Sequence, residues 1–225
     1  MEKIKIIKDI TAAFDVDAMK CFTPLCSAEL PVPDGQNIVE ELNAQAKFAR
    51  VRVGSKDAHS PKAVWVTNNT AEIATPVPDA LKGANVDLRW PVHAVPGTLG
   101  FELLDGLPKP YYYDYFVWKG IEPDMHPYGA CYHDLQDKFS TGVIEYLRGQ
   151  GIVFVIVGGL AWDYCVGTTA EQLLKAKFRV ILNQAATRGI SDEGCKATTI
   201  KLHDMGALII SDSRDLELIW SGMRV

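Results

Sequence analysis

The apolar run IVFVIV at positions 152–157 constrains the fold of this chain more than any other feature. A strand with one face in water alternates polar and apolar side chains, and this run has no such alternation. It is typical of a strand buried on both faces, as in a parallel sheet covered by helices. Gly158 and Gly159 close the run. The sequence therefore predicts an α/β protein built around such a strand.

Other segments with strand or helix patterns alternate along the chain. The expected strands are residues 10–17, 50–53, 115–118, 152–157, 179–182 and 207–210. The expected helices are residues 37–48, 139–147, 165–177 and 192–205. Strands that alternate with helices predict a parallel sheet with helices on both faces. Because no internal repeat or linker interrupts the pattern, we expect residues 1–225 to form one domain.

Composition excludes several classes of protein. With 48% hydrophobic and 23% charged residues, the chain has enough apolar surface to fold, unlike a disordered protein. Its formal net charge of −5 argues against a nucleic-acid partner, and no apolar run is long enough for a membrane span. The five cysteines form no C-x-x-C pair, and the N-terminal segment lacks the apolar core of a signal peptide. We therefore expect a cytoplasmic protein.

Chemically reactive side chains follow the ends of several expected strands. They are Asp15, Asp17, Asp57, His59, Lys119 and Cys165. In an open parallel sheet, ligands bind beyond the carboxyl ends of the strands. These side chains are therefore expected to converge on one edge of the sheet.

Cys165 is the sharpest candidate for a catalytic group. It follows a strand and a glycine pair, and it opens an expected helix. The N-terminus of a helix favours a thiolate, the nucleophilic form of cysteine, and its free N–H groups can hold an oxyanion. A buried structural cysteine is an equally good interpretation of this position.

Asp17 and Lys119 are candidates for the proton acceptor and the charge partner of this thiol. None of the five histidines marks itself as the base. A carboxylate can accept a thiol proton when burial raises its pKa. The alternatives are a solvated loop acid or helix cap for Asp17, and a surface lysine for Lys119.

A metal site is suggested by the D-x-H pair of Asp57 and His59, with His93 further along in WPVH. Two imidazoles and a carboxylate suit an open divalent site of the zinc or iron type. A D-x-H pair alone is a weak signal. The alternatives are a solvated loop histidine for His59 and a hydrogen-bonded core histidine for His93.

Several blocks of sequence together resemble one family. They are FDVDAMKCFTPLC, SKDAH, RWPVHAVPGTLGFEL, VWKG and GGLAWDYCVGTTA, followed by QAATRGI. In this order, and over nearly the whole chain, they resemble the nicotinamidase/pyrazinamidase family of the isochorismatase-like cysteine hydrolases. The resemblance implies a three-layer α-β-α fold with a mostly parallel sheet of about six strands.

The resemblance also implies roles for individual residues. The implied catalytic triad is Asp17, Lys119 and Cys165. The implied metal ligands are Asp57, His59 and His93, around a divalent zinc or iron ion. The backbone N–H groups of Ala161 and Cys165 form the implied oxyanion hole, after a cis peptide bond that precedes Ala161. Phe22 and Trp90 are the implied aromatic walls of the substrate pocket.

The implied activity is hydrolysis of nicotinamide to nicotinate and ammonia through a cysteine thioester, a step of NAD salvage. The partner is then a small-molecule amide, with neither nucleic acid nor membrane, and a homo-oligomer is expected because the family often forms one. One alternative is a related amidase for another small amide or an N-carbamoyl compound. An isochorismatase-type hydrolysis is another, but it does not need Cys165. A catalytically silent binding protein is a third, against which the intact triad argues.

Three positions depart from the family pattern. Met19 stands where the family commonly has glutamine, Cys21 where a polar residue is usual, and Trp162 where a small residue is typical. Trp162 is bulky enough to change the pocket or its entrance. These departures bear on the choice of substrate and leave the implied triad intact.

Overall fold

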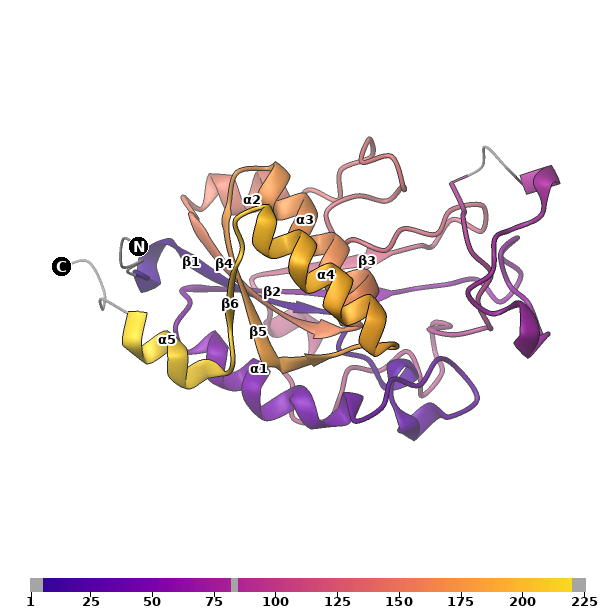
Figure 1. The fold of residues 1–225 in the computed structure, drawn as a ribbon, viewed down its shortest axis with the longest axis horizontal. Helices are drawn as coiled ribbons and strands as arrows, with labels where there is room; N and C mark the ends of the chain where they lie inside the picture. Colours follow the sequence, from indigo (N-terminus) through magenta and orange to yellow (C-terminus); the bar gives the residue numbers. More distant parts are fainter. Residues whose placement is uncertain (1–5, 82–84, 220–225) are drawn as a thin grey trace.

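The computed structural model describes residues 6–81 and 85–219, and within them six parallel strands form one sheet (Figure 1). The strands are β1 (Thr11–Val16), β2 (Val51–Asp57), β3 (Tyr115–Lys119), β4 (Phe154–Leu160), β5 (Arg179–Arg188) and β6 (Leu208–Ile210). Their order across the sheet is β3-β2-β1-β4-β5-β6, and every pairing is parallel. The predicted parallel sheet of about six strands is confirmed.

Helices cover both faces of this sheet. They are α1 (Val39–Ala46), α2 (Val143–Gly149), α3 (Gly167–Lys175), α4 (Asp192–Asp204) and α5 (Ser213–Ile219). In Figure 1, α1 and α5 lie on one side of the sheet, and α2, α3 and α4 lie on the other. The predicted three-layer arrangement is therefore confirmed. None of the helices in the described part of the chain is both long enough and apolar enough to cross a bilayer.

The strand order places a topological switch point between β1 and β4. From β1 the chain moves to β2 and β3 on one side of it, and then crosses to β4 on the other side. Loops leave the carboxyl ends of β1 and β4 in opposite directions at such a point, which opens a crevice for a ligand. All six residues of β1 and all seven of β4 are buried, so the strands that frame this crevice are rigidly packed.

Several element boundaries differ from those expected from the sequence. The helix expected over residues 139–147 begins at Val143, because Gly142 adopts a left-handed backbone and Ser140 binds the Gly142 N–H through its hydroxyl. Asp134 accepts hydrogen bonds from the backbone N–H groups of Lys138 and Phe139, which holds this stretch as a loop. β5 runs six residues beyond its expected end, and α5 was not expected. Pairing with a neighbouring strand and docking onto the sheet decide such boundaries, and a local pattern does not carry that information.

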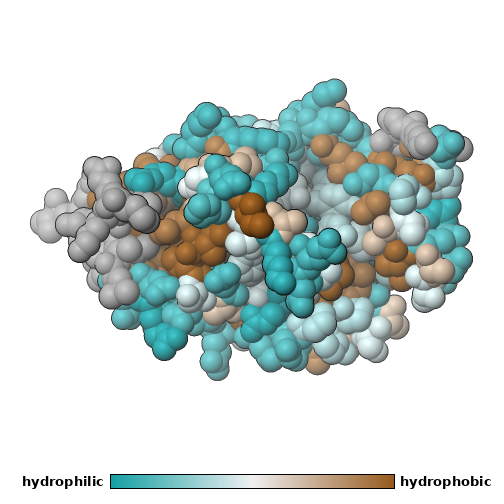
Figure 2. All heavy atoms as spheres, in the orientation of Figure 1, coloured by the Kyte–Doolittle hydropathy of each residue, from teal (hydrophilic) through white to brown (hydrophobic). Residues whose placement is uncertain are grey.

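A long irregular segment connects β2 to β3, and it extends beyond the carboxyl ends of the strands (Figure 1). It has its own small hydrophobic cluster, which consists of Ala63, Trp65, Val77, Val86 and Trp90. Figure 2 shows apolar residues on the surface of the same end of the molecule. Because this cluster anchors the segment, the segment can hold side chains in fixed positions above the sheet.

Gly159 permits the closest approach of β1 and β4. It pairs with Val16, its φ is +130°, and a Cβ atom there would lie 1.9 Å from the Val16 carbonyl oxygen. We expect Gly159→Ala to lower the free energy of unfolding by more than about 1 kcal/mol, since both the backbone conformation and the contact are incompatible with a side chain. Urea denaturation followed by circular dichroism measures the change.

The matched control is Gly149→Ala at the end of α2, where an added Cβ atom meets nothing within 4 Å. Alanine there is expected to leave stability unchanged or to raise it by up to about 1 kcal/mol. Equal effects of the two substitutions would contradict the assigned role of Gly159.

Candidate active site

Three of the side chains expected at the sheet edge do meet there. Asp17 follows β1 directly, Lys119 is the last residue of β3, and Cys165 lies in the π-helical turn Trp162–Val166 that leads into α3. The Lys119 Nζ atom lies 3.0 Å from Asp17 Oδ2 and 3.8 Å from Cys165 Sγ. The Cys165 thiol also hydrogen-bonds to Asp17, and all three side chains are buried. The structure thus brings a carboxylate, an ammonium group and a thiol into mutual contact.

A serine on the adjacent strand fixes the position of Asp17. The Ser55 hydroxyl donates to Asp17 Oδ1 at 2.6 Å and accepts from the Asp17 backbone N–H at 3.2 Å. Asp17 has a φ of 44°, in the left-handed region that non-glycine residues rarely occupy. This conformation ends β1 and turns the carboxylate toward Lys119 and Cys165, while the remaining oxygen, Oδ2, faces the Lys119 ammonium group.

Burial and the charge of Lys119 together set the protonation states of Asp17, Lys119 and Cys165. Burial raises the pKa of Asp17 to about 6, although Lys119 opposes the shift. Burial alone would lower the pKa of Lys119, but the carboxylates of Asp17 and Asp57 raise it above its usual range. Burial raises the pKa of the Cys165 thiol well above its usual value, against the opposing effect of Lys119. At neutral pH the resting site therefore contains a thiol beside a carboxylate and an ammonium group.

Asp15 lies two residues before Asp17 and has a different environment. Its Oδ2 atom lies 2.7 Å from Arg52 Nη2 and accepts a hydrogen bond from the Tyr113 hydroxyl at 2.9 Å. Strand alternation would put residues 15 and 17 on the same face, but Asp17 lies just beyond the end of β1 with a left-handed backbone. Its carboxylate contacts Lys119, whereas that of Asp15 contacts Arg52. Asp15 is thus part of a separate buried ion pair.

A cluster of three buried imidazoles, from His59, His93 and His126, adjoins the thiol site. Each can offer one nitrogen, and these nitrogens lie within 4.8 Å of one another. The Nδ1 atoms of His59 and His93 lie 2.9 Å and 2.8 Å from the backbone carbonyls of Gly120 and Pro91, so both rings direct Nε2 elsewhere. Burial lowers the pKa of His93 to about 3 and that of His126 well below its usual value, so both rings are neutral. Neutral imidazole is the form that binds metals.

Asp57 connects the imidazole cluster to the triad. Its Oδ1 atom accepts a hydrogen bond from Lys119, and its Oδ2 atom lies 3.5 Å from His59 Nε2. Burial alone would raise the pKa of Asp57, but Lys119 and His59 hold it well below its usual range. This carboxylate is thus ionised and faces both groups, and its role as a metal ligand stays a prediction.

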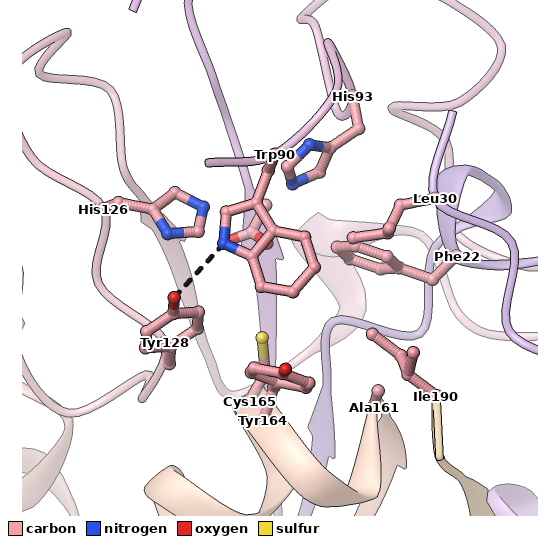
Figure 3. Close-up of a pocket in the computed structure, with 11 residues that line it drawn as sticks. Phe22, Leu30, Trp90, His93, His126, Tyr128, Ala161, Tyr164, Cys165 and Ile190 are labelled. Carbon is pink, nitrogen blue, oxygen red and sulfur yellow. Dashed lines mark hydrogen bonds between the residues drawn. The ribbon is translucent and has the colours of Figure 1, made fainter. Parts of the chain in front are cut away.

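A pocket opens above the Cys165 sulfur, and its walls are mostly aromatic or aliphatic (Figure 3). The lining residues are Phe22, Leu30, Asp57, Trp90, His93, His126, Tyr128, Ala161, Tyr164, Cys165 and Ile190. Figure 3 shows the Cys165 sulfur directed toward the Trp90 ring, and the Trp90 Nε1–H group donates to the Tyr128 hydroxyl at 3.2 Å. The pocket thus places a flat apolar space directly beside the thiol.

Comparison with known proteins shows which family this chain resembles. The sequence profile of the isochorismatase domain matches residues 11–213. The chain belongs to the isochorismatase domain family. Nicotinamidases of Acinetobacter baylyi and Escherichia coli K12 are 28% and 27% identical to it, over 72% and 78% of this chain and 73% and 78% of theirs. A match of 31% identity to the nicotinamidase of Saccharomyces cerevisiae covers only about half of each chain, 46% of this one and 49% of the other.

Solved structures agree with the isochorismatase-family fold. A nicotinamidase/pyrazinamidase of Acinetobacter baumanii superposes with a TM-score of 0.81 at 24% identity, over 92% of this chain and 98% of its own, which shows the fold alone. The pyrazinamidase of Pyrococcus horikoshii, solved in complex with zinc, has a TM-score of 0.68 at 27% identity, over 89% of this chain and 98% of its own.

The structure places the remaining predicted residues of this isochorismatase-family chain around the pocket. Phe22 and Trp90 are both in its lining, as are Ala161 and Cys165. The peptide bond between Leu160 and Ala161 is cis, as expected. The roles of Phe22 and Trp90 in substrate binding, and of the Ala161 and Cys165 N–H groups as an oxyanion hole, stay predictions.

The three departures from the family pattern lie outside this lining. Trp162 instead lines a separate surface pocket with Gln184 and Cys195, so its bulk does not narrow the space above the thiol. Met19 and Cys21 are fully buried and pack in a hydrophobic cluster. Phe22 and Ala161, which line the pocket, belong to the same cluster as Met19 and Cys21.

Among the polar and aromatic side chains of the pocket, the sequence did not predict three, His126, Tyr128 and Tyr164. His126 and Tyr128 lie in the irregular stretch after β3, where no spacing or periodicity connects them to the other groups. Tyr164 directly precedes Cys165, and this adjacency to the candidate nucleophile was the one available signal. The other two could be found only from the fold.

Within the described residues, Lys119 is the only lysine or arginine that forms an ion pair with Asp17 and Asp57. We expect Lys119→Met to lower the free energy of unfolding at pH 7 by about 3–5 kcal/mol, because it leaves two buried carboxylates without a counter-charge. The deficit should shrink as the pH falls, since unpaired buried carboxylates have raised pKa values and the folded state then takes up protons. Urea titrations at several pH values measure both effects.

Lys175→Met is the control, because Lys175 is half exposed and pairs with Glu171 and Asp137 at the surface. That substitution should change stability by no more than about 1 kcal/mol. A Lys119→Met variant as stable as this control would contradict the account of the buried ion pairs.

Proposed function

We propose that this chain is a cysteine hydrolase that converts nicotinamide to nicotinate and ammonia. The observation that carries the proposal is the position of the Cys165 sulfur, in contact with Asp17 and Lys119 and open to an aromatic pocket. The nicotinamidases among its relatives support the choice of substrate. A flat ring between Phe22 and Trp90 suits these walls better than the non-aromatic N-carbamoyl alternative.

In the first half of the reaction, Asp17 accepts the proton of the Cys165 thiol and the sulfur attacks the carboxamide carbon. Lys119 stays protonated and offsets the negative charge that moves between Asp17 and the sulfur. The electron pair of the carbonyl bond moves onto oxygen, and the N–H groups of Ala161 and Cys165 donate hydrogen bonds to this oxyanion. Proximity of the three triad groups supplies the orientation that this step requires.

In the second half, the tetrahedral intermediate collapses and the C–N bond breaks. Asp17 gives its proton to the departing nitrogen, so ammonia leaves and a thioester remains on Cys165. Asp17, again a carboxylate, then takes a proton from a water molecule that attacks the thioester carbon. The C–S bond breaks, the sulfur recovers the proton from Asp17, and nicotinate is released.

We further propose that Asp57, His59 and His93 bind a divalent metal ion, zinc or iron. The buried His59 Nε2 atom faces Asp57 Oδ2 at 3.5 Å, so an imidazole nitrogen and a carboxylate oxygen, both common metal donors, lie side by side. Imidazole and carboxylate donors suit both metals. When bound, the ion would supply a Lewis acid for the pyridine nitrogen of the substrate and so orient the ring.

The remaining expectations belong to the same proposal. One sheet takes strands from β1 through β6, which supports residues 1–225 as a single isochorismatase-like domain. The five cysteines are free thiols, which is compatible with the reducing cytoplasm. Assembly into a homo-oligomer stays a prediction from the family.

The direct test is Cys165→Ala. Loss of the nucleophile should lower the rate of ammonia release from nicotinamide by more than about a thousandfold, with an unchanged circular dichroism spectrum. Cys195→Ala is the matched control, because Cys195 lies in α4 outside the pocket lining, and it should keep the activity. Substantial turnover by the Cys165 variant would exclude the covalent route.

The proposed role of Asp17 as proton acceptor predicts that the hydrolysis rate depends on pH. Asp17 must be ionised to accept the thiol proton, and its pKa is raised to about 6. The kcat/KM for nicotinamide should therefore fall about tenfold per pH unit below about pH 6 and level off above it. Initial rates from pH 4.5 to 8, with tryptophan fluorescence to confirm folding, measure the profile. A limb near pH 4, where an ordinary aspartate titrates, would contradict the assignment.

A further inference from the structure

His126 is a buried imidazole with two unused nitrogens. Its side chain is almost completely enclosed, and neither Nδ1 nor Nε2 has a hydrogen-bond partner among residues 6–81 and 85–219. Buried polar groups in folded proteins are nearly always paired, since an unpaired one loses its hydration without compensation. Within the described structure, His126 is the only histidine with both ring nitrogens in this state. A buried imidazole in this state suggests that its nitrogens bind something other than the protein, such as a metal ion.

The surroundings of His126 identify the class of that ligand. Its ring centroid lies 5.0 Å from that of His59 and 6.1 Å from that of His93. The nitrogens that the three rings offer lie within 4.8 Å of one another, and His59 Nε2 lies 3.5 Å from the Asp57 carboxylate. Three buried imidazole nitrogens this close together are typical donors for a transition-metal ion.

The irregular segment holds His126 in this position from two sides. Its backbone N–H donates to the Asn85 carbonyl at 2.7 Å, and the Trp65 indole N–H donates to the carbonyl of the preceding residue, Met125, at 3.1 Å. The Trp65 ring also packs against the imidazole, with 4.3 Å between centroids. These contacts fix the position of the His126 ring before any metal binds. Imidazoles in metal sites are usually held in this way.

We propose that His126 is a third imidazole ligand of the metal ion, together with His59 and His93. The inference deepens the proposed function because it concerns the metal of the same site, and it adds a ligand that the D-x-H and WPVH motifs do not contain. Three nitrogen donors favour zinc, cobalt or iron over magnesium and manganese, which prefer oxygen. Asp57, adjacent to His59 and bound to Lys119, adds negative charge at the edge of the imidazole cluster.

X-ray absorption at the zinc edge tests the proposal on the unaltered protein. The full chain is loaded with one equivalent of Zn²⁺. The number of imidazole ligands per zinc is then obtained from the multiple-scattering signal of the imidazole rings. Three imidazoles per zinc support the proposal. Two imidazoles per zinc, or no bound zinc, overturn it. This measurement needs no variant, so a variant that fails to fold does not weaken the test.

His126→Ala and His126→Gln then test the energetic role of the ligand. Competition with a chromophoric chelator should show zinc affinity at least about tenfold to a hundredfold weaker than in the unaltered protein, since even partners behind metal ligands contribute that much. The His59→Ala variant should show a similar loss. His203→Ala is the matched control, because His203 is exposed near the end of α4 and should leave the affinity unchanged. Unchanged affinity in both folded His126 variants overturns the proposal.

The two proposals fail in distinguishable ways. Ammonia release from nicotinamide by a protein with only two imidazoles on zinc would remove His126 from the metal site and leave the proposed function standing. Three imidazoles on zinc, without ammonia release from nicotinamide, would remove the substrate and leave His126 as a ligand. The zinc measurements use no substrate, so neither result depends on the other.

Discussion

The rest of the site depends on the buried ammonium group of Lys119. It lies 3.0 Å from Asp17, binds Asp57, and lies 3.8 Å from the Cys165 sulfur, with no exposure to solvent. Two carboxylates at this depth could not both remain ionised without a cation between them. Lys119 therefore stabilises two ionised carboxylates at once, that of Asp17, the proposed base, and that of Asp57 beside the imidazole cluster. The triad and the imidazole cluster are one electrostatic unit, in which a change in one half alters the other.

Sheet topology explains how these groups meet. Asp17 ends β1, Asp57 ends β2 and Lys119 ends β3, three neighbouring parallel strands whose carboxyl ends share an edge. The turn after β4 then brings Cys165 across the switch point toward Asp17. Gly159 lets β1 and β4 approach closely enough for this contact. Backbone packing therefore decides the distances that the proposed chemistry needs.

The charge state of the thiol differs from the one that its place in the sequence suggests. A cysteine at the start of a helix is expected to be a thiolate, but burial and the nearby carboxylates raise the pKa of Cys165. The opposing effect of Lys119 does not outweigh them. In the proposed mechanism Asp17 activates the thiol, and burial raises the pKa of Asp17 into the range where it can exchange a proton near neutral pH. The raised pKa of Cys165 favours the protonated thiol in the resting site.

The sequence by itself determined the parallel sheet, the strand-end positions of Asp17, Asp57, Lys119 and Cys165, and the likeness to one family. These features depend on residues close together in the sequence, such as an unbroken apolar run or a short motif. A local sequence pattern is therefore enough to predict them. Only the tertiary structure decided that His126, Tyr128 and Tyr164 line the same pocket, that Trp162 lies outside its lining, and that the Cys165 proton is held tightly. Those features depend on burial and on contacts between segments far apart in the chain. Desolvation and Coulomb interactions act through space, and the order of residues does not record them.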